Sequence, residues 1–358
     1  MLNMLFTGII SLMLFGYAPT HARSVFRPQD PYKPKLSVAW ENKHKQCILE
    51  SYYLQEYPLF GIFDQEHFFN NYLPTGSIHF RNDKNKSVDG TTIALLIDEL
   101  LEEINQKKKL PKIKRSTEFK HFSILRKRNF NRKKKNGFMI LKCKDYPFVV
   151  KLSIETPESF TQPFTKGFEP LFFFFMAGGT NRHLSGFTRI KNAAYVRNCI
   201  AQTPDLDVEF DIPRKWFYIP KNCPWIELNG TNIGKNKHIS TSIPGTYCII
   251  ADAIDFDHKF TITCKNDREV SMKLCNLVNF YIDPHIDNFL IEKGTNKVVI
   301  IDTEHFPTIT GMGQIDTVYT SQIHWYVDLA AKCFGDLFLR DKSQRKLIAQ
   351  NGAGQLKL

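Results

Sequence analysis

Acidic and amide side chains that could do phosphate chemistry are concentrated in one segment of this 358-residue chain. Asp283 precedes Asn288 by five positions, and an apolar run further along leads into Asp302. An aspartate in a loop can accept the proton of an attacking hydroxyl, while an asparagine and a second aspartate offer the hard oxygen ligands that Mg²⁺ prefers. The segment therefore indicates phosphoryl transfer, in which a protein mainly positions the acceptor and neutralises phosphate charge.

A β-hairpin is expected to hold Asn288 and Asp302 on one side of the protein. Asn288 leads into a short apolar strand at 289–291, and a Gly/Asn turn follows at 294–296. A second apolar strand at 298–301 then returns the chain and ends at Asp302. Apolar runs separated by such a turn are typical of hairpins, so the two side chains should lie close together.

A second predicted hairpin supplies a candidate phosphate-binding lysine. The runs 138–143 and 148–152 are apolar and are separated by a turn, which predicts two antiparallel strands. Lys151 lies near the end of the second strand, where a lysine could bind the α- and β-phosphates of a nucleotide. Further strands are expected at 121–125, 216–219 and 246–251, a surface loop at 229–245, and helices at 91–104, 168–177, 189–201 and 272–280.

The chemistry-bearing segment resembles the protein-kinase-like superfamily. There an Asp-x₄-Asn catalytic loop is followed, after a β-hairpin, by a metal-binding aspartate; here 283–288 reads Asp-Pro-His-Ile-Asp-Asn and 301–304 reads Ile-Asp-Thr-Glu. These forms look more like the aminoglycoside/choline-kinase and phosphoinositide-kinase branches than like ordinary protein kinases. The resemblance implies an α+β, two-lobed fold, with an antiparallel β-rich N-lobe at 121–252 and a mostly helical C-lobe, containing the catalytic loop, at 253–358.

The resemblance also implies a role for each matching residue. Asp283 would be the catalytic base, and Asn288 and Asp302 would be the metal ligands. The implied cofactors are ATP and Mg²⁺, and the implied acceptor is a hydroxyl of a small molecule or lipid. Turn capping by Asp283 and Asn288, and an ordinary acid at a strand end for Asp302, are the structural alternatives.

Nucleotide contacts follow from the same resemblance. Lys151 would bind phosphate, and Asp252 lies in the strand and hinge, 246–255, that would contact adenine. The helix glutamate that partners the lysine in this superfamily would be Glu169, with Glu155 and Glu158 as alternatives.

The chain departs from the superfamily between its first two strands, where no glycine-rich loop is present. Residues 126–135 are strongly basic instead, and only Gly137 follows them. A basic loop could hold phosphates by charge, and it would equally suit an anionic lipid surface. Nucleic acid is not an expected partner, because such sites interleave several aromatic side chains and Phe130 is the one available. A second departure is Tyr281-Ile282, which replaces the His-Arg that precedes the catalytic aspartate of most protein kinases.

The N-terminal part of the chain indicates export. Residues 1–22 contain an uncharged apolar run followed by small residues, which predicts a signal peptide or an N-terminal membrane anchor and hence a periplasmic or secreted protein. Residues 23–120 read as a loop-rich extension with one amphipathic helix. The net charge of +12 favours anionic partners. The eight cysteines match no zinc spacing, and their pairing is left open.

Four hypotheses follow from the sequence. The first is an ATP- and Mg²⁺-dependent phosphotransferase acting on a small molecule or lipid. A catalytically inactive pseudokinase, serving as an exported binding module, and a protein kinase are alternatives within the same fold. A basic surface-binding protein without this fold would instead leave Lys151, Asp283 and Asp302 far apart. The sequence gives no indication of oligomeric state.

Overall fold

The protein has a mixed α+β fold built from antiparallel strands and a few helices. A computed structural model describes residues 37–41, 46–50, 70–107, 119–131, 136–155, 179–223, 225–232, 237–305 and 318–327. Every described residue belongs to one compact unit, Lys33–Leu358. The predicted signal segment 1–22 and the predicted helix 168–177 lie outside the described residues.

A five-stranded sheet is the largest described element. Its order is β5-β6-β7-β12-β9, and each neighbouring pair is antiparallel. The strands predicted at 121–125, 138–143, 148–152, 216–219 and 246–251 are thereby confirmed. The strand bounds are β5 Phe122–Asn131, β6 Asn136–Cys143, β7 Phe148–Ile154, β9 Lys215–Tyr218 and β12 Thr246–Asp252.

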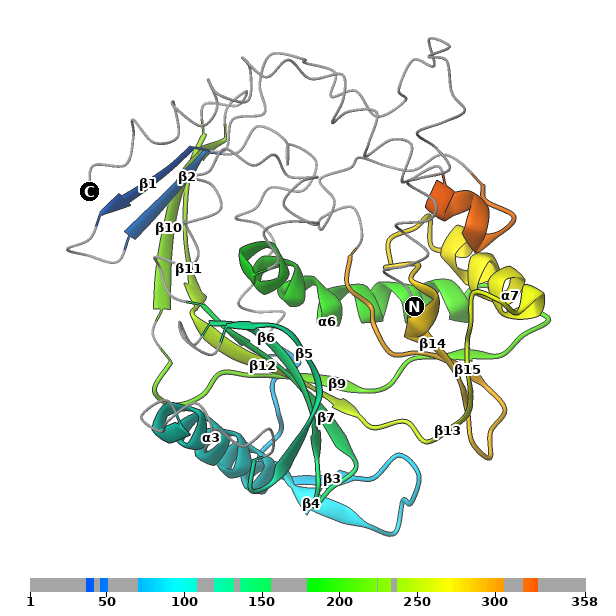
Figure 1. The fold of residues 1–358 in the computed structure, drawn as a ribbon, viewed down its shortest axis with the longest axis horizontal. Helices are drawn as coiled ribbons and strands as arrows, with labels where there is room; N and C mark the ends of the chain where they lie inside the picture. The colour runs from blue at the N-terminus through cyan, green and yellow to red at the C-terminus, as the bar shows by residue number, and fades with distance from the viewer. Residues whose placement is uncertain are drawn as a thin grey trace. The chain divides into compact units, whose positions relative to one another are not determined.

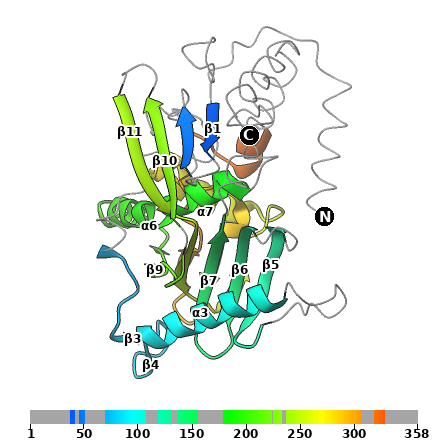
Figure 2. The same ribbon diagram turned by 90° about the vertical axis from the view of Figure 1, so that its left-hand side faces the viewer.

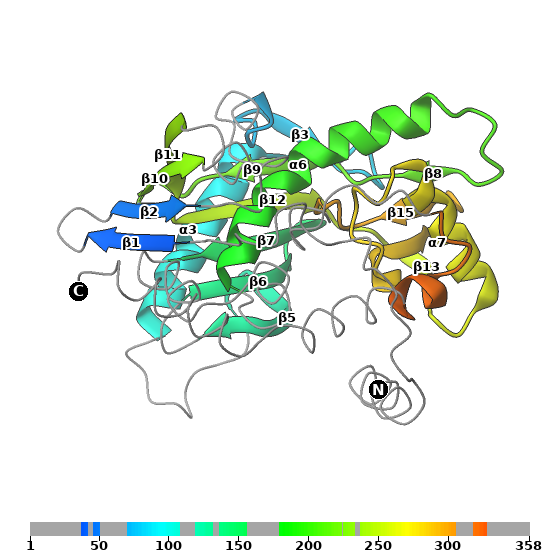
Figure 3. The same cartoon turned by 90° about the horizontal axis from the view of Figure 1, so that it is seen from above.

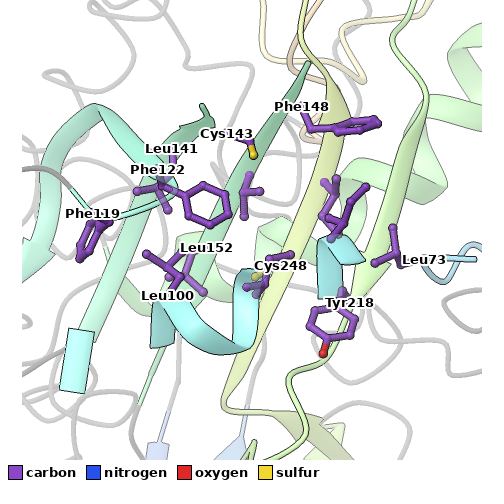
Figure 4. Close-up of a cluster of buried hydrophobic side chains, with 14 of the residues drawn as sticks. Leu73, Leu100, Phe119, Phe122, Leu141, Cys143, Phe148, Leu152, Tyr218 and Cys248 are labelled. Carbon is purple, nitrogen blue, oxygen red and sulfur yellow. The ribbon is translucent and has the colours of Figure 1, made fainter. Parts of the chain in front are cut away.

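One face of this sheet packs on helix α3 (Gly90–Lys107), which confirms the predicted amphipathic helix. Successive side chains of a strand point to opposite faces, so Phe148, Val150 and Leu152 of β7 all enter the same core. Figure 4 shows Leu100 of α3 among side chains from several strands of the sheet. Because α3 shares this core, residues 70–107 are part of the main fold and not a separate domain.

Helix α6 (Gly179–Ala201) covers the opposite face of the sheet (Figure 1). The remaining strand positions therefore point toward α6, among them Lys151 of β7 and Lys215 of β9. Aromatic packing fixes the helix there, since the ring of Phe187 lies 4.4 Å from that of Tyr247 on β12. The predicted helix 189–201 is the second half of α6.

A second, four-stranded sheet carries the hairpin predicted around Asn288 and Asp302. Its order is β13-β14-β15-β8, and β14 pairs antiparallel with β15 as expected. Figure 3 shows β13 and β15 of this sheet beside helix α7. In the described part of 253–358 these short strands accompany α7. The bounds are β8 Phe210–Asp211, β13 Phe256–Lys259, α7 Lys265–Leu277, the 3₁₀ turn η4 Ile286–Asn288, β14 Phe289–Glu292 and β15 Val298–Ile300.

Two predicted loops are strands over part of their length. The loop predicted at 229–245 is mostly the hairpin of β10 (Trp225–Asn232) and β11 (Lys237–Pro244), seen in Figure 2. The sequence of this hairpin is polar and lacks a clear apolar alternation. Strand β2 (Gln46–Glu50), which is far away in the chain, pairs with β10, and β1 (Ser37–Glu41) pairs with β2. The predicted basic loop 126–135 was also wrong in part, because β5 continues to Asn131. β5 is an edge strand, where basic side chains are well tolerated.

A short hairpin ties the N-terminal extension to the second sheet. It consists of β3 (Ser77–His79) and β4 (Ser87–Asp89), and Arg81 lies in the connection between them. The Arg81 guanidinium contacts Glu292 of β14 at 2.6 Å and Asp211 of β8 at 2.7 Å. This half-buried bridge fixes the extension against the strands that lead to Asp302.

Candidate functional site

The centre of the candidate site is an ion pair between Lys151 and Asp302. Lys151 Nζ lies 2.9 Å from Asp302 Oδ2, although the two residues come from β7 and from the segment after β15. Lys151 is only 7% exposed. The sequence predicted that these two residues would share a site, and the described contacts bring them together.

Arg189, in the middle of α6, is a third member of the site. Its Nε lies 2.9 Å from Asp302 Oδ1, and an Nη atom lies 2.6 Å from Glu304 Oε2. The guanidinium also stacks over the ring of Phe138, at 5.3 Å from the ring centroid. Arg189 is 3% exposed and is therefore held between two carboxylates and an aromatic face.

Lys215 and Asn192 connect the site to α6 and β9. Lys215 Nζ donates a 2.6 Å hydrogen bond to the hydroxyl of Thr303, which in turn donates to the carbonyl oxygen of Arg189 at 2.6 Å. The amide of Asn192 donates to the carbonyl oxygens of Tyr281 and Thr303 at 2.6 and 3.0 Å. These bonds satisfy buried backbone groups on both sides of the predicted catalytic loop, which fixes it to the helix.

Asp283 and Asn288 belong to a compact loop next to Asp302. The backbone N–H of His285 donates to Asp283 Oδ1 at 3.1 Å, and Asn288 Nδ2 donates to the Asp283 carbonyl oxygen at 3.1 Å. The N–H of Asp283 donates to the carbonyl oxygen of Glu304 at 3.1 Å, which joins the loop to the strand end. Asp283 therefore caps the turn that leads to Asn288, and its role as a catalytic base stays a prediction.

Electrostatics differ sharply between the two aspartates. Burial raises the pKa of Asp283, and the nearby Asp302 carboxylate raises it further against the opposing effect of His285. Burial would also raise the pKa of Asp302, but Arg189, Lys151 and Lys215 outweigh it and hold this pKa well below 3.8. Asp302 thus stays ionised, whereas Asp283 binds a proton more readily than an exposed aspartate. Two carboxylates with separated pKa values are typical of acid–base sites.

Burial lowers the pKa values of the two lysines at the site, whereas the pKa of Arg189 is raised. Burial lowers the pKa of Lys151, which Asp302 only partly offsets. Burial and then the neighbouring Lys151 hold the pKa of Lys215 well below 10.5. Burial acts in the same direction on Arg189, but Asp302 and Glu304 outweigh it and raise that pKa. Arg189 is therefore the permanently charged partner of Asp302.

The other residues predicted to contact nucleotide or to pair with Lys151 are Asp252 and three glutamates. The Asp252 carboxylate is bound by Arg214 at 2.7 and 2.9 Å, and its contact with adenine stays a prediction. Glu155 follows β7, and side-chain alternation puts it on the same face as Lys151. Four residues along a strand span about 13 Å, which is too far for a direct ion pair between these two side chains. Glu169 and Glu158 lie outside the described residues.

A Mg²⁺ ion bound to Asp302 does not fit this arrangement of side chains. Both carboxylate oxygens already contact a cation, Lys151 on one and Arg189 on the other. A metal at Asp302 Oδ1 would stand beside the fixed guanidinium, and like charges at that range repel strongly in a buried site. Within the described part of the chain, no three His, Cys, Asp or Glu side chains gather closely enough to hold a metal.

Arg189 and Lys215 are the site residues that sequence reasoning missed. The sequence predicts Arg189 only as the first residue of a helix, and it places Lys215 just before a predicted strand. A sequence signal for a basic partner is that residues 179–201 contain basic residues but no Asp or Glu, so this helix cannot supply the expected glutamate.

Other predicted features are only partly covered by the described residues. In the basic run, Arg126 lies 3.4 Å from Asp287, which Lys259 also contacts at 3.3 Å. Six cysteines of the described ranges are free, namely Cys143, Cys199, Cys223, Cys248, Cys264 and Cys275, and of these Cys143 and Cys248 are buried in strands. Among the described helices none has the length and apolar character needed to cross a membrane.

No model of a known protein family matches the chain, and no curated protein matches it.

Proposed function

We propose that this chain is a kinase-like domain that binds a nucleotide and transfers its γ-phosphoryl group to a hydroxyl. The observation that carries the proposal is the 2.9 Å contact of Lys151 with Asp302, beside the loop of Asp283. Three residues chosen from the sequence for one chemistry come from three separate elements, and chance gathering of this kind is rare. A basic protein with these residues far apart is not supported.

The arrangement of strands also supports a two-lobed, kinase-like fold. A five-stranded antiparallel sheet carries the lysine, and a helix covers the face on which that lysine lies. The candidate catalytic loop and its hairpin belong to a second, smaller sheet beside α7. This division supports the proposal of a β-rich lobe and a separate catalytic lobe.

Asp283 is proposed as the residue that acts on the acceptor. Its carboxylate accepts the hydroxyl proton while the acceptor oxygen forms a bond to the γ-phosphorus and the bond to the β-phosphate oxygen breaks. The raised pKa brings this base closer to neutral pH, where proton transfer is most efficient. Lys151 binds the phosphates, and Asn192 fixes the loop by its two hydrogen bonds.

The acceptor and the location of the protein remain proposals from the sequence. The Asp-x-His and Asp-x-Glu forms at 283–285 and 302–304 favour a small molecule or lipid over a protein acceptor. Export rests on the apolar segment 1–22.

Release of ADP from ATP, with water or a panel of hydroxyl acceptors, tests the enzymatic proposal. Asp283→Asn should lower turnover by about 10²–10⁴-fold, the usual contribution of a positioned base. Asp257→Asn, an exposed aspartate on β13, is the matched control and should leave turnover unchanged. Equal turnover in wild type and Asp283→Asn would refute the assigned role of Asp283.

A pseudokinase is the second candidate, and α6 favours it. The helix offers no carboxylate to Lys151, and Arg189 holds the acid that a catalytic metal would need. This candidate predicts a saturable rise in melting temperature with ATP but no ADP release. Absence of both binding and turnover would exclude both candidates.

A further inference from the structure

Three buried basic side chains gather around residues 302–304 from three different elements. Lys151, Arg189 and Lys215 are each no more than 7% exposed, and they come from β7, α6 and β9. Asp302 contacts Lys151 and Arg189, and Glu304 contacts Arg189. The Asp302 side chain remains 16% exposed, so this cluster reaches solvent.

The cations keep donor capacity that the described protein groups do not use. Lys215 forms no ion pair within the described ranges, and its Nζ donates a hydrogen bond to the uncharged hydroxyl of Thr303. Arg189 Nη1 is buried, and it has no hydrogen-bond partner among the described residues. A buried ammonium without a carboxylate is costly, and a buried donor is normally satisfied. The Lys215 ammonium, which lacks a carboxylate partner in the described ranges, points to an anion that is bound when the site is in use.

The same geometry leaves no suitable place for a divalent cation at Asp302. Arg189 cannot easily be withdrawn, because its guanidinium is held by Asp302, by Glu304 and by the face of Phe138. Its carbonyl oxygen is also bound by the Thr303 hydroxyl. A guanidinium offers several donors in a rigid fork that suits phosphate oxygens. It can therefore neutralise phosphate charge where other sites use a metal.

We propose that Lys151, Arg189 and Lys215 bind the nucleotide phosphates as fixed cations, so that nucleotide binds here without a divalent metal at Asp302. The inference rests on the proposed nucleotide site but is separable from it. Nucleotide binding as such is the proposed function, whereas independence from the metal is the new claim. A free polyphosphate has the same anionic groups as a nucleotide and is the alternative ligand of the same chemistry.

Calorimetric titration of the full chain with ATP, in excess EDTA and in excess MgCl₂ at equal ionic strength, tests this claim. The dissociation constants should agree within about threefold. Binding that is at least about tenfold tighter with MgCl₂ would overturn the inference and leave the proposed function standing. Absence of binding in both buffers would refute the nucleotide site itself. Displacement of ATP by tripolyphosphate but not by adenosine is expected if phosphate groups provide the affinity; displacement by adenosine alone would overturn the inference.

Lys215→Met separates a binding role from a structural one. Methionine removes the charge at similar size, so the variant should be at least as stable as wild type while ATP affinity in EDTA falls about tenfold or more. Lys142→Met, an exposed lysine on β6, is the matched control and should keep wild-type affinity. Loss of stability in Lys215→Met with unchanged ATP affinity would show that Lys215 is only structural and would overturn its assignment.

Discussion

Replacing Gly186 by alanine should destabilise the protein, although alanine is the better helix former. A Cβ atom at position 186 would lie 1.9 Å from Tyr247 Oη and 3.1 Å from both Tyr247 Cζ and Arg189 Nη1. Overpacking of a filled interior costs about 1–3 kcal/mol. The gain in helix propensity is about 0.5–1 kcal/mol. The free energy of unfolding should therefore fall by about 1 kcal/mol, the difference between the midpoints of those two ranges.

The tyrosine hydroxyl cannot easily move away from this contact. It donates a hydrogen bond to the carbonyl oxygen of His183, and its ring packs between Phe187 and Phe217. Tyr247→Phe removes the clashing atom and the hydrogen bond, at a cost of about 1 kcal/mol by itself. Adding Gly186→Ala to that variant should then cost little, so the two changes couple by about 1–2 kcal/mol.

Urea denaturation of the two single variants and the double variant measures this coupling. Ala194→Gly, at an exposed position of the same helix, calibrates the propensity term and should cost about 0.5–1 kcal/mol. Gly186→Ala as stable as wild type, or strictly additive changes, would refute the close packing of α6 on β12. That packing is what places Arg189 against Asp302.

Two further predictions concern stability. Arg81→Met should lower the free energy of unfolding by about 3 kcal/mol in urea titrations, because it leaves the buried Glu292 without its cation. Lys86→Met, at an exposed pair, should change it by less than about 0.5 kcal/mol; equal effects would contradict the anchoring role of Arg81. Burial lowers the pKa of His183 from 6.5 to about 4, so the unfolded chain takes up this proton first as the pH falls. The free energy of unfolding should therefore decline from pH 6.5 toward pH 4, and His183→Gln should make this decline less steep. Part of the decline should remain, because burial also lowers the pKa of His305 to about 4. An unchanged slope in His183→Gln would contradict a buried neutral imidazole at position 183.

The strands and the hairpin at 289–301 are predictable because their signal is local. Apolar runs of three to six residues, joined in pairs by turns, mark 138–143 with 148–152 and 289–291 with 298–301, and both pairs form paired strands. The polar hairpin at 225–244 has no such signal. Its two strands pair with each other, and β10 also pairs with β2, a long-range pairing that leaves no trace in the local pattern.

The ionic partners at the site were not predictable for a similar reason. Lys151 was assigned a helix glutamate by resemblance, yet the described helix places Arg189 over Asp302. Which helix residue faces a strand depends on the rotation of the helix, and here that rotation is set by contacts such as Phe187 with Tyr247. Lys215 reaches the site because the neighbouring strand β12 pairs Ala251 with it, a register that the sequence does not specify.

Covalent labelling by an acyl-phosphate derivative of ATP tests the central claim most directly. The amine of a lysine next to bound phosphates attacks the acyl carbon and displaces ATP, and peptide mass spectrometry then locates the acylated residue. Lys151 should be labelled, with Lys215 the second site, because the Lys151 amine contacts Asp302, the Lys215 amine contacts the adjacent Thr303, and burial lowers both pKa values. Excess ATP should suppress this labelling but leave the exposed Lys142 unaffected. Labelling confined to exposed lysines, or labelling of Lys151 that excess ATP does not reduce, would contradict a nucleotide site between Lys151 and Asp302.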